Sequence, residues 1–206
     1  SNPWLGVGWR KSTQISIPIK EYVNKKGINF IAGRVTEILA DKNQLKINDT
    51  EIVDYDYLVI ATGHELAFDQ IEGAGPDGFT QSVCSLDHAE ASYENFSELI
   101  ENPGPVVVGA FQGASCFGPA YEYAFILEKA LRDEKVRDRV PMTFVTCEPY
   151  IGHLGLGGVG DSKGLLESDL RSHHIADSSA EVLPELTGSS LSQDDKLITV
   201  VFVHQS

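Results

Sequence analysis

The sequence predicts an α/β fold of the Rossmann-like type, with an incomplete first nucleotide-binding domain and a second dinucleotide-type domain. Two segments lead to this prediction: an apolar strand pattern that ends at Ala61-Thr62-Gly63, and a strand–turn–helix–strand succession over residues 106–146. The composition also changes near residue 80. We therefore expect a partial first domain in residues 1–80 and a truncated second domain in residues 81–206.

Composition and charge limit the classes of partner. The chain has 206 residues, 42% apolar and 22% charged, which suits a globular core of one or two domains. Its formal net charge of -14 would repel nucleic-acid phosphates and anionic lipids, so we expect no nucleic acid partner, and membrane contact only through segments absent from this chain. No apolar run is long enough to span a bilayer. The chain has three cysteines and no C-x-x-C pair, so we expect no metal site.

The first half of the chain predicts short elements separated by turns. Residues 1–17 are expected to form a loop, and residues 18–26 a short helix that ends at Gly27. Short strands are then expected to alternate with turns, at positions 28–32, 35–40, 44–47 and 51–53.

The segment Tyr55-Asp56-Tyr57-Leu58-Val59-Ile60-Ala61-Thr62-Gly63 is the most specific motif. Its apolar centre is typical of a buried parallel strand. Thr62 and Gly63 let the backbone approach a cofactor without a side-chain clash. An ordinary core strand with a glycine turn is the alternative. The combination of acidic, aromatic and Ala-Thr-Gly elements is similar to the segment that closes the FAD domain of flavoprotein disulfide reductases.

The second half predicts a helix followed by a βαβ unit. Residues 64–80 are a connector, Ser85 is a suitable N-cap for a helix that extends to Ile100, and Pro103-Gly104 breaks the helical pattern. The other expected elements are a strand at 106–109, a glycine-rich turn at 109–118, a helix at 119–133, a strand at 142–146, a loop at 148–163, a helix at 164–172 and a strand at 197–203.

The turn Gly109-Ala110-Phe111-Gln112-Gly113-Ala114 stands where a second dinucleotide fingerprint belongs, after a strand and before a helix. In G-x-G-x-x-G/A the middle glycine lets a pyrophosphate approach the backbone, and here that position is Phe111. A phenyl ring would occupy the pyrophosphate space, which argues against NAD(P)H binding. A shifted register that uses Gly109, Gly113 and Gly118 is the alternative.

Cys116 precedes the helix expected from Pro119, where the helix dipole and free N–H groups favour a thiolate. A thiolate is the form that attacks a disulfide sulfur or a flavin. A structural cysteine in a tight turn is the alternative. Glu122 lies one turn further on, where it can either relay protons or cap the same turn.

Cys84 also precedes a helix, and His88, four residues later, can bring an imidazole near the thiol to shuttle a proton. His153 lies on the loop after the strand at 142–146, at the sheet edge where open α/β folds bind ligands. Capping or solvent-exposed roles are the alternatives for these residues. Cys147 is interpreted as a small buried residue.

Five segments together resemble the bacterial sulfide:quinone oxidoreductases, over residues 1 to about 175. They are Ser1–Trp4, Gln81–Glu90, Gly113–Ala124, Glu148–Gly155 and Gly158–Gly164. The resemblance implies a peripheral membrane protein with two Rossmann-like domains, the first of them the FAD-binding domain. Such a protein oxidises sulfide, passes two electrons to FAD and then to a membrane quinone, and builds polysulfide on cysteine.

The resemblance also implies roles for individual residues. Cys116 matches the cysteine near the flavin that joins the sulfur bridge and attacks the isoalloxazine, and Cys84 matches a second cysteine that starts or releases the sulfur chain. Residues that match proton-handling histidines and an acidic residue near the site are His88, His153 and Glu122. Backbone positions that match contacts to FAD are Val35, Thr62 and Gly63.

Several family features have no match in the sequence: the third essential cysteine, which Cys147 does not match, the first G-x-G-x-x-G, the quinone pocket and the C-terminal membrane helices. We therefore expect a soluble internal fragment of a longer enzyme, inactive alone and binding FAD weakly or not at all. The alternatives are an NADH:quinone reductase or a flavocytochrome-type sulfide dehydrogenase of the same superfamily, and a non-catalytic flavoprotein-like binding module. Phe111 argues against the first, and the pair Cys84 and Cys116 against the third. The sequence has no C-x-x-C-H haem motif, but the second alternative stays open because a partner chain could carry the haem. Homo-oligomerisation stays open.

Overall fold

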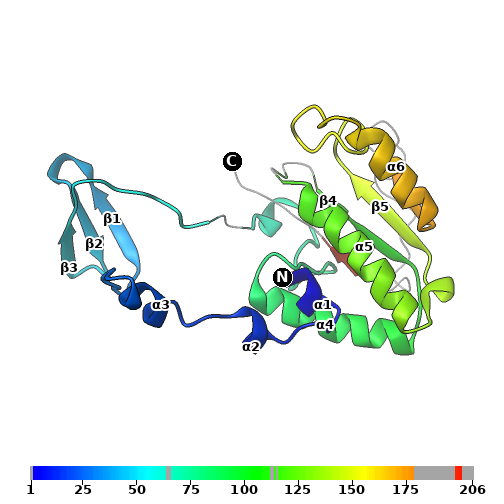
Figure 1. Cartoon of the computed structure of the whole chain (residues 1–206), viewed down its shortest axis with the longest axis horizontal. Helices are drawn as coiled ribbons and strands as arrows, with labels where there is room; N and C mark the ends of the chain where they lie inside the picture. Colours follow the sequence, from blue (N-terminus) through cyan, green and yellow to red (C-terminus); the bar gives the residue numbers. More distant parts are fainter. Residues whose placement is uncertain (1, 64–65, 112–113, 115, 179–197, 201–206) are drawn as a thin grey trace. The chain divides into compact units, whose positions relative to one another are not determined.

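The computed structural model of the chain describes residues 2–63, 66–111, 114, 116–178 and 198–200. The chain divides into two compact units, one made of Ser1–Ile15 and His64–Ser206 and the other of Ser16–Gly63 (Figure 1). The division at residue 80 into an FAD domain and a second domain stays a prediction.

The larger unit contains a parallel four-stranded sheet with the order β6-β5-β4-β7. In chain order this is the arrangement 3-2-1-4 of a dinucleotide-binding half, so the predicted α/β Rossmann-like class is confirmed. β6 was not predicted, because four residues directly after a helix give too short a pattern to read. β7 lies inside the strand expected at 197–203. The strands are β4 (Val106–Ala110), β5 (Met142–Thr146), β6 (Ile175–Ser178) and β7 (Ile198–Val200).

Gly109 allows β4 and β5 to lie side by side. It pairs with Val145, and a Cβ atom at this position would lie 1.9 Å from the Val145 carbonyl oxygen. No side chain fits at that distance, so the first glycine of the predicted fingerprint is required by strand packing.

The long helices begin and end near the predicted residues. Ser85 caps α4, because its Oγ accepts the backbone N–H of His88 at 3.4 Å, and Pro119 lies in the first turn of α5. The helices of this unit are α1 (Asn2–Gly6), α2 (Ser12–Ile15), α4 (Leu86–Glu101), α5 (Gly118–Asp133) and α6 (Ser162–Ser172), with short 3-10 turns at Phe68–Gln70 and Arg137–Arg139.

The prediction that residues 1–17 form a loop was wrong. α1 packs against α4 and α5, and Leu5 and Val7 are buried in the main core. The burial of these apolar side chains stabilises a helix too short to form by itself.

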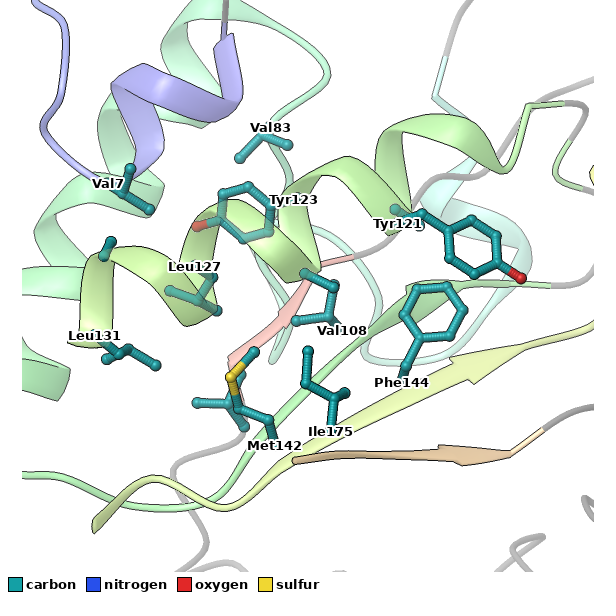
Figure 2. Close-up of a cluster of buried hydrophobic side chains, with 14 of the residues drawn as sticks. Val7, Val83, Val108, Tyr121, Tyr123, Leu127, Leu131, Met142, Phe144 and Ile175 are labelled. Carbon is teal, nitrogen blue, oxygen red and sulfur yellow. The ribbon is translucent and has the colours of Figure 1, made fainter. Parts of the chain in front are cut away.

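The main core lies between α5 and the sheet (Figure 2). Buried side chains of the strands, such as Val108 and Phe144, face buried side chains of α5. The rings of Tyr121 and Phe144 stack with centroids 4.3 Å apart, which fixes the first turns of α5 over β5. α5 contributes Tyr121, Tyr123, Leu127 and Leu131 to this core.

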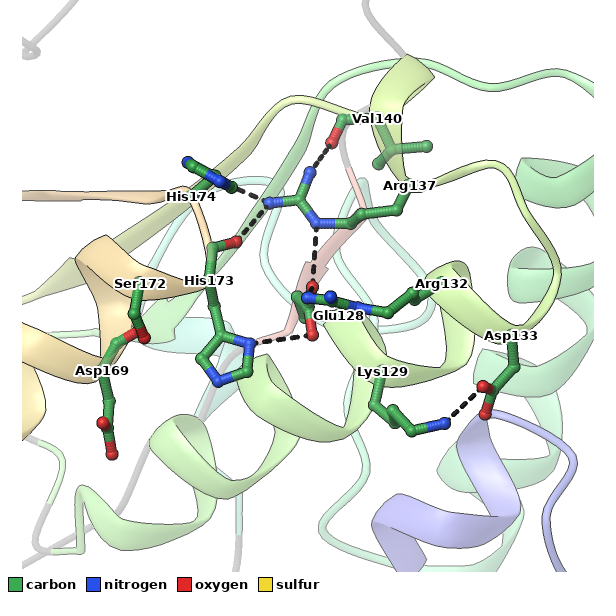
Figure 3. Close-up of polar contacts among 10 residues, drawn as sticks. All are labelled: Glu128, Lys129, Arg132, Asp133, Arg137, Val140, Asp169, Ser172, His173 and His174. Atoms are coloured by element: carbon green, nitrogen blue, oxygen red, sulfur yellow. Dashed lines mark hydrogen bonds and ion pairs between the residues drawn. The ribbon is translucent and has the colours of Figure 1, made fainter.

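A buried ionic cluster joins the C-terminal half of α5 to the starts of β5 and β6 (Figure 3). Glu128 is 1% exposed, forms ion pairs with Arg132 and with Nε of Arg137 at 3.6 Å, and is hydrogen-bonded with Nδ1 of His173 at 3.1 Å. Arg137 also donates to the carbonyl oxygens of Val140, His173 and His174. The cluster lies next to Val140 and His174, which precede the two strands, so it belongs to the N-terminal edge of the sheet.

The smaller unit is an antiparallel sheet of β1 (Val35–Leu39), β2 (Gln44–Ile47) and β3 (Glu51–Asp54), with α3 (Ile19–Lys25) before it and a 3-10 turn at Ala40–Lys42. These three strands and α3 confirm the predictions, and Gly27 after α3 has the left-handed φ of 73° expected of a C-terminal glycine.

Two other predicted strands of this unit are absent. Residues 28–32 are irregular, and so are residues 55–63, where Tyr57, Val59 and Ile60 are 94%, 86% and 64% exposed. A buried parallel strand requires neighbouring strands, and residues 55–63 belong to neither of the two sheets that the described residues form.

Candidate active site

The predicted site residues of the larger unit lie mainly on segments that follow the C-terminal ends of β4 and β5. Cys116 is exposed, two residues before α5 begins. The Cys147 thiol donates a hydrogen bond of 3.2 Å to the carbonyl oxygen of Phe111, which ties the turn after β4 to the end of β5. Ligands of open α/β sheets bind at this edge.

Cys84 is partly buried just before α4. Burial raises the pKa of its thiol to about 11, against the opposing effect of a hydrogen bond with Ser82, and the nearby Cys116 raises this pKa further. Cys84 is therefore a protonated thiol at neutral pH. Both predicted cysteines lie shortly before a helix of the larger unit, Cys84 before α4 and Cys116 before α5.

His88 lies in the first turn of α4, with its ring centroid 5.8 Å from that of Phe68. Among the described residues, its buried Nδ1 has no hydrogen-bond partner. A buried nitrogen without a partner is costly unless another group uses it. The proton exchange predicted between His88 and Cys84 stays a prediction.

His153 is partly exposed on the loop between β5 and α6. Its ring packs edge-on against the ring of Tyr150, and the two ring centroids are 5.2 Å apart. The same loop reaches the start of α5, because a Cβ atom at Gly155 would lie 3.4 Å from Cε2 of Phe117. Phe117 is the neighbour of Cys116, so the loop of His153 and the turn of Cys116 lie against each other.

Glu122 lies on α5 with an exposed side chain, within reach of solvent near the same end of the helix. Its predicted role, as a proton relay or a cap, stays a prediction.

Val35, Thr62 and Gly63 belong to the smaller unit and are exposed. Gly63 has a φ of 77°, and a Cβ atom there would meet nothing within 4 Å. The backbone at this position is therefore open, which is compatible with a contact to a large planar cofactor such as FAD.

Phe111, at the middle position of the predicted fingerprint, joins a small apolar cluster. It packs with Phe68 and Ile71 against Ala67, which is 2% exposed. These contacts give the phenyl ring a structural role in the larger unit.

Sequence patterns assigned no role to Glu148 and Tyr121, two residues that hydrogen-bond with the loop of His153. Glu148 is 1% exposed, and its Oε2 accepts the hydroxyl groups of Tyr121 and Thr146, each at 2.7 Å. Burial raises the pKa of the Tyr121 phenol, which therefore stays protonated as a donor. The sequence signal that could have identified this role was the position of Glu148, a charged residue that follows the buried strand β5.

In the part of the chain that the structure describes, no group of three or more histidine, cysteine or acidic side chains has the geometry of a metal site. None of the described helices has the length and apolar character that a bilayer span needs.

Comparison with known proteins adds to this geometry. No protein-family model matches the chain. The sulfide-quinone reductase of Aquifex aeolicus strain VF5 is 46% identical over 166 residues, which are 80% of this chain and 38% of the relative. The X-ray structure of the sulfide:quinone oxidoreductase from A. aeolicus superimposes with a TM-score of 0.86 and 37% identity, over 100% of this chain and 49% of that one.

The chain is a homologue of the sulfide:quinone oxidoreductases.

This homology confirms the resemblance to sulfide:quinone oxidoreductases that the sequence motifs indicated. The mitochondrial sulfide:quinone oxidoreductase of Dictyostelium discoideum is also similar, 30% identical over 125 residues that cover 58% of this chain and 27% of the relative. An NAD-dependent persulfide reductase from A. fulgidus, with a TM-score of 0.60 and 22% identity over 98% of this chain and 38% of that one, shows the fold alone. The chain thus spans less than half the length of these relatives.

Proposed function

We propose that the chain supplies the cysteine chemistry of an FAD-dependent sulfide:quinone oxidoreductase, as part of a longer protein. The observation on which this rests is the position of Cys116, which is exposed between the C-terminal end of β4 and the start of α5, with Cys84 shortly before α4 of the same unit. The 46% identity to a sulfide-quinone reductase supports it, and because the chain covers 38% of that relative, the complete reaction is proposed for a longer protein that contains this chain.

In the proposed reaction, hydrosulfide attacks the sulfur bonded to Cys116 in a disulfide or persulfide. A new S–S bond forms on the attacked sulfur, and Cys116 leaves as a thiolate with the bonding electron pair. The proton of the attacking hydrosulfide passes to a nearby base, for which His153 is the candidate. When bound, FAD supplies the two-electron oxidation, and a quinone is the final acceptor.

The other residues are proposed to move protons and to contact the cofactor. Cys84 is protonated at neutral pH, so its attack on sulfur requires a base, and the unpartnered Nδ1 of His88 can serve as one. Glu122 would exchange protons with solvent. Val35, Thr62 and Gly63 would contact FAD through their exposed backbone. Membrane contact would come from segments outside this chain, and the chain alone would bind FAD weakly and be inactive.

Replacement of Cys116 tests this proposal, with Cys147 as the matched control. In the full-length protein, Cys116→Ala should lower sulfide-dependent quinone reduction at least about a hundredfold, because the attacking and leaving sulfur is lost. Cys147→Ala removes a thiol that has no proposed part in the reaction and should retain most of the rate. An unchanged rate in Cys116→Ala would remove the catalytic assignment.

A further inference from the structure

A buried carboxylate lies directly after β5, outside the proposed chemistry. Both Oε atoms of Glu148 accept hydrogen bonds, Oε2 from the hydroxyls of Tyr121 and Thr146 at 2.7 Å and Oε1 from the backbone N–H of Leu154. A carboxylate that is 1% exposed is tolerated only when its oxygens are hydrogen-bonded in this way.

Two of these bonds lead to the residues on either side of His153. The Leu154 N–H donates to Glu148 directly, and the Gly152 N–H donates to the Tyr121 hydroxyl at 2.9 Å, which in turn donates to Glu148. One carboxylate therefore determines the backbone on both sides of a proposed catalytic histidine.

The conformation of this segment requires such anchoring. Gly152 and Leu154 have left-handed φ values of 81° and 56°, and this region is strained for a leucine. A Cβ atom at Gly152 would lie 2.7 Å from the Ser162 carbonyl oxygen. The Ser162 hydroxyl donates to the Gly152 carbonyl at 2.7 Å, so α6 fixes the same residue from the other side.

The position of Glu148 suggests another role, which its contacts exclude. Dinucleotide-binding domains use an acidic residue beyond the glycine turn to bind a ribose hydroxyl. Glu148 follows the turn by one helix and one strand. Its two oxygens are already used by three internal donors and are buried, so they are not available to a ribose.

We propose that Glu148, acting partly through Tyr121, is a positioning residue that orients the loop of His153 at the sheet edge. The part of this inference that concerns catalysis rests on the proposed function of His153. The anchoring of the loop does not, and it can be measured in the chain itself.

The first experiment measures backbone amide hydrogen exchange in this chain by NMR. Tyr121→Phe removes the acceptor of the Gly152 N–H and should speed its exchange at least about tenfold. Glu148→Gln should speed exchange of both Gly152 and Leu154. The matched control is Tyr123→Phe, which also removes one buried hydroxyl of α5, bonded to Ser92 at 3.1 Å, and should change neither amide selectively. Unchanged exchange at Gly152 in Tyr121→Phe would overturn the proposal.

The second experiment measures sulfide-dependent flavin reduction in the full-length protein. Tyr121→Phe and Glu148→Gln should slow it at least about threefold, but by less than His153→Ala, whereas Tyr123→Phe should not. If His153→Ala is slow and both network variants keep the wild-type rate, positioning by Glu148 is overturned. If His153→Ala itself keeps the wild-type rate, the proposed function of His153 fails and the catalytic part of this inference fails with it. Faster amide exchange would then still establish the anchoring of the loop.

Discussion

At the scale of single residues, burial distinguishes the two cysteines of the candidate site. Cys116 is exposed, whereas burial raises the pKa of Cys84 to about 11. Only the thiolate of a cysteine reacts rapidly, so the two thiols should differ in reactivity at neutral pH although both precede a helix.

This difference predicts the order of alkylation. Iodoacetamide should modify Cys116 before Cys84 near neutral pH, because Cys116 is accessible and Cys84 is a protonated, partly buried thiol. Below its pKa, the rate at Cys84 should rise about tenfold for each pH unit, as its thiolate fraction rises. Peptide mass spectrometry over a pH series measures both rates. Equal rates at the two cysteines near neutral pH would contradict the assigned burial.

The sequence located Cys84 and Cys116 before helices, His88 in the first turn of a helix and His153 on a loop after a strand, and the structure describes all four at such positions. It did not predict the protonated state of Cys84 or the role of Glu148. Both depend on burial and on partners distant in sequence, such as Tyr121, and a local sequence pattern shows neither the burial nor the distant partners.

At the scale of elements, the pairing of β4 and β5 depends on one glycine. Gly109→Ala would bring a Cβ atom within 1.9 Å of the Val145 carbonyl oxygen, so the two strands would have to separate. We expect a loss of at least about 2 kcal/mol in the free energy of unfolding, measured by urea denaturation. Gly118→Ala is the control, because a Cβ atom there meets nothing within 4 Å, and it should change stability little.

The ionic cluster of α5 predicts a second effect on stability. Glu128→Gln leaves Arg137 and Arg132 without their buried anionic partner, and should lower the free energy of unfolding by about 3 kcal/mol. The exposed ion pair of Lys129 and Asp133 on the same helix is the control, since Asp133→Asn should cost less than about 1 kcal/mol. Thermal unfolding of both variants tests this, and equal losses would contradict the structural role of Glu128.

Strong local patterns predicted the elements well. The helices 85–100 and 119–133 and the strands 106–109 and 142–146 have clear periodicity, caps and breakers, and all four are present. The strands expected at 28–32 and 55–63 are absent, because an apolar run becomes a strand only when another strand pairs with it. α1 was missed for the converse reason, since tertiary contacts stabilise it.

At the scale of the whole molecule, the two compact units differ in the structural features that they contain. The larger unit has a parallel sheet, a buried core and two cysteines that precede helices, whereas in the smaller unit the segment resembling a flavoprotein motif is exposed. Under the proposed function, the electron donor of the longer protein is sulfide rather than a nicotinamide, a proposal that draws on the homology to sulfide:quinone oxidoreductases.

The most direct test of that claim uses the full-length protein under anaerobic conditions, mixed with sulfide in one experiment and with NADH in another. The visible absorbance of its flavin reports reduction in each. We predict that sulfide bleaches the flavin and NADH does not, because Phe111 replaces the middle glycine of the dinucleotide fingerprint and both carboxylate oxygens of Glu148 already accept internal hydrogen bonds. Bleaching by NADH alone would contradict the proposed function and indicate an NADH:quinone reductase.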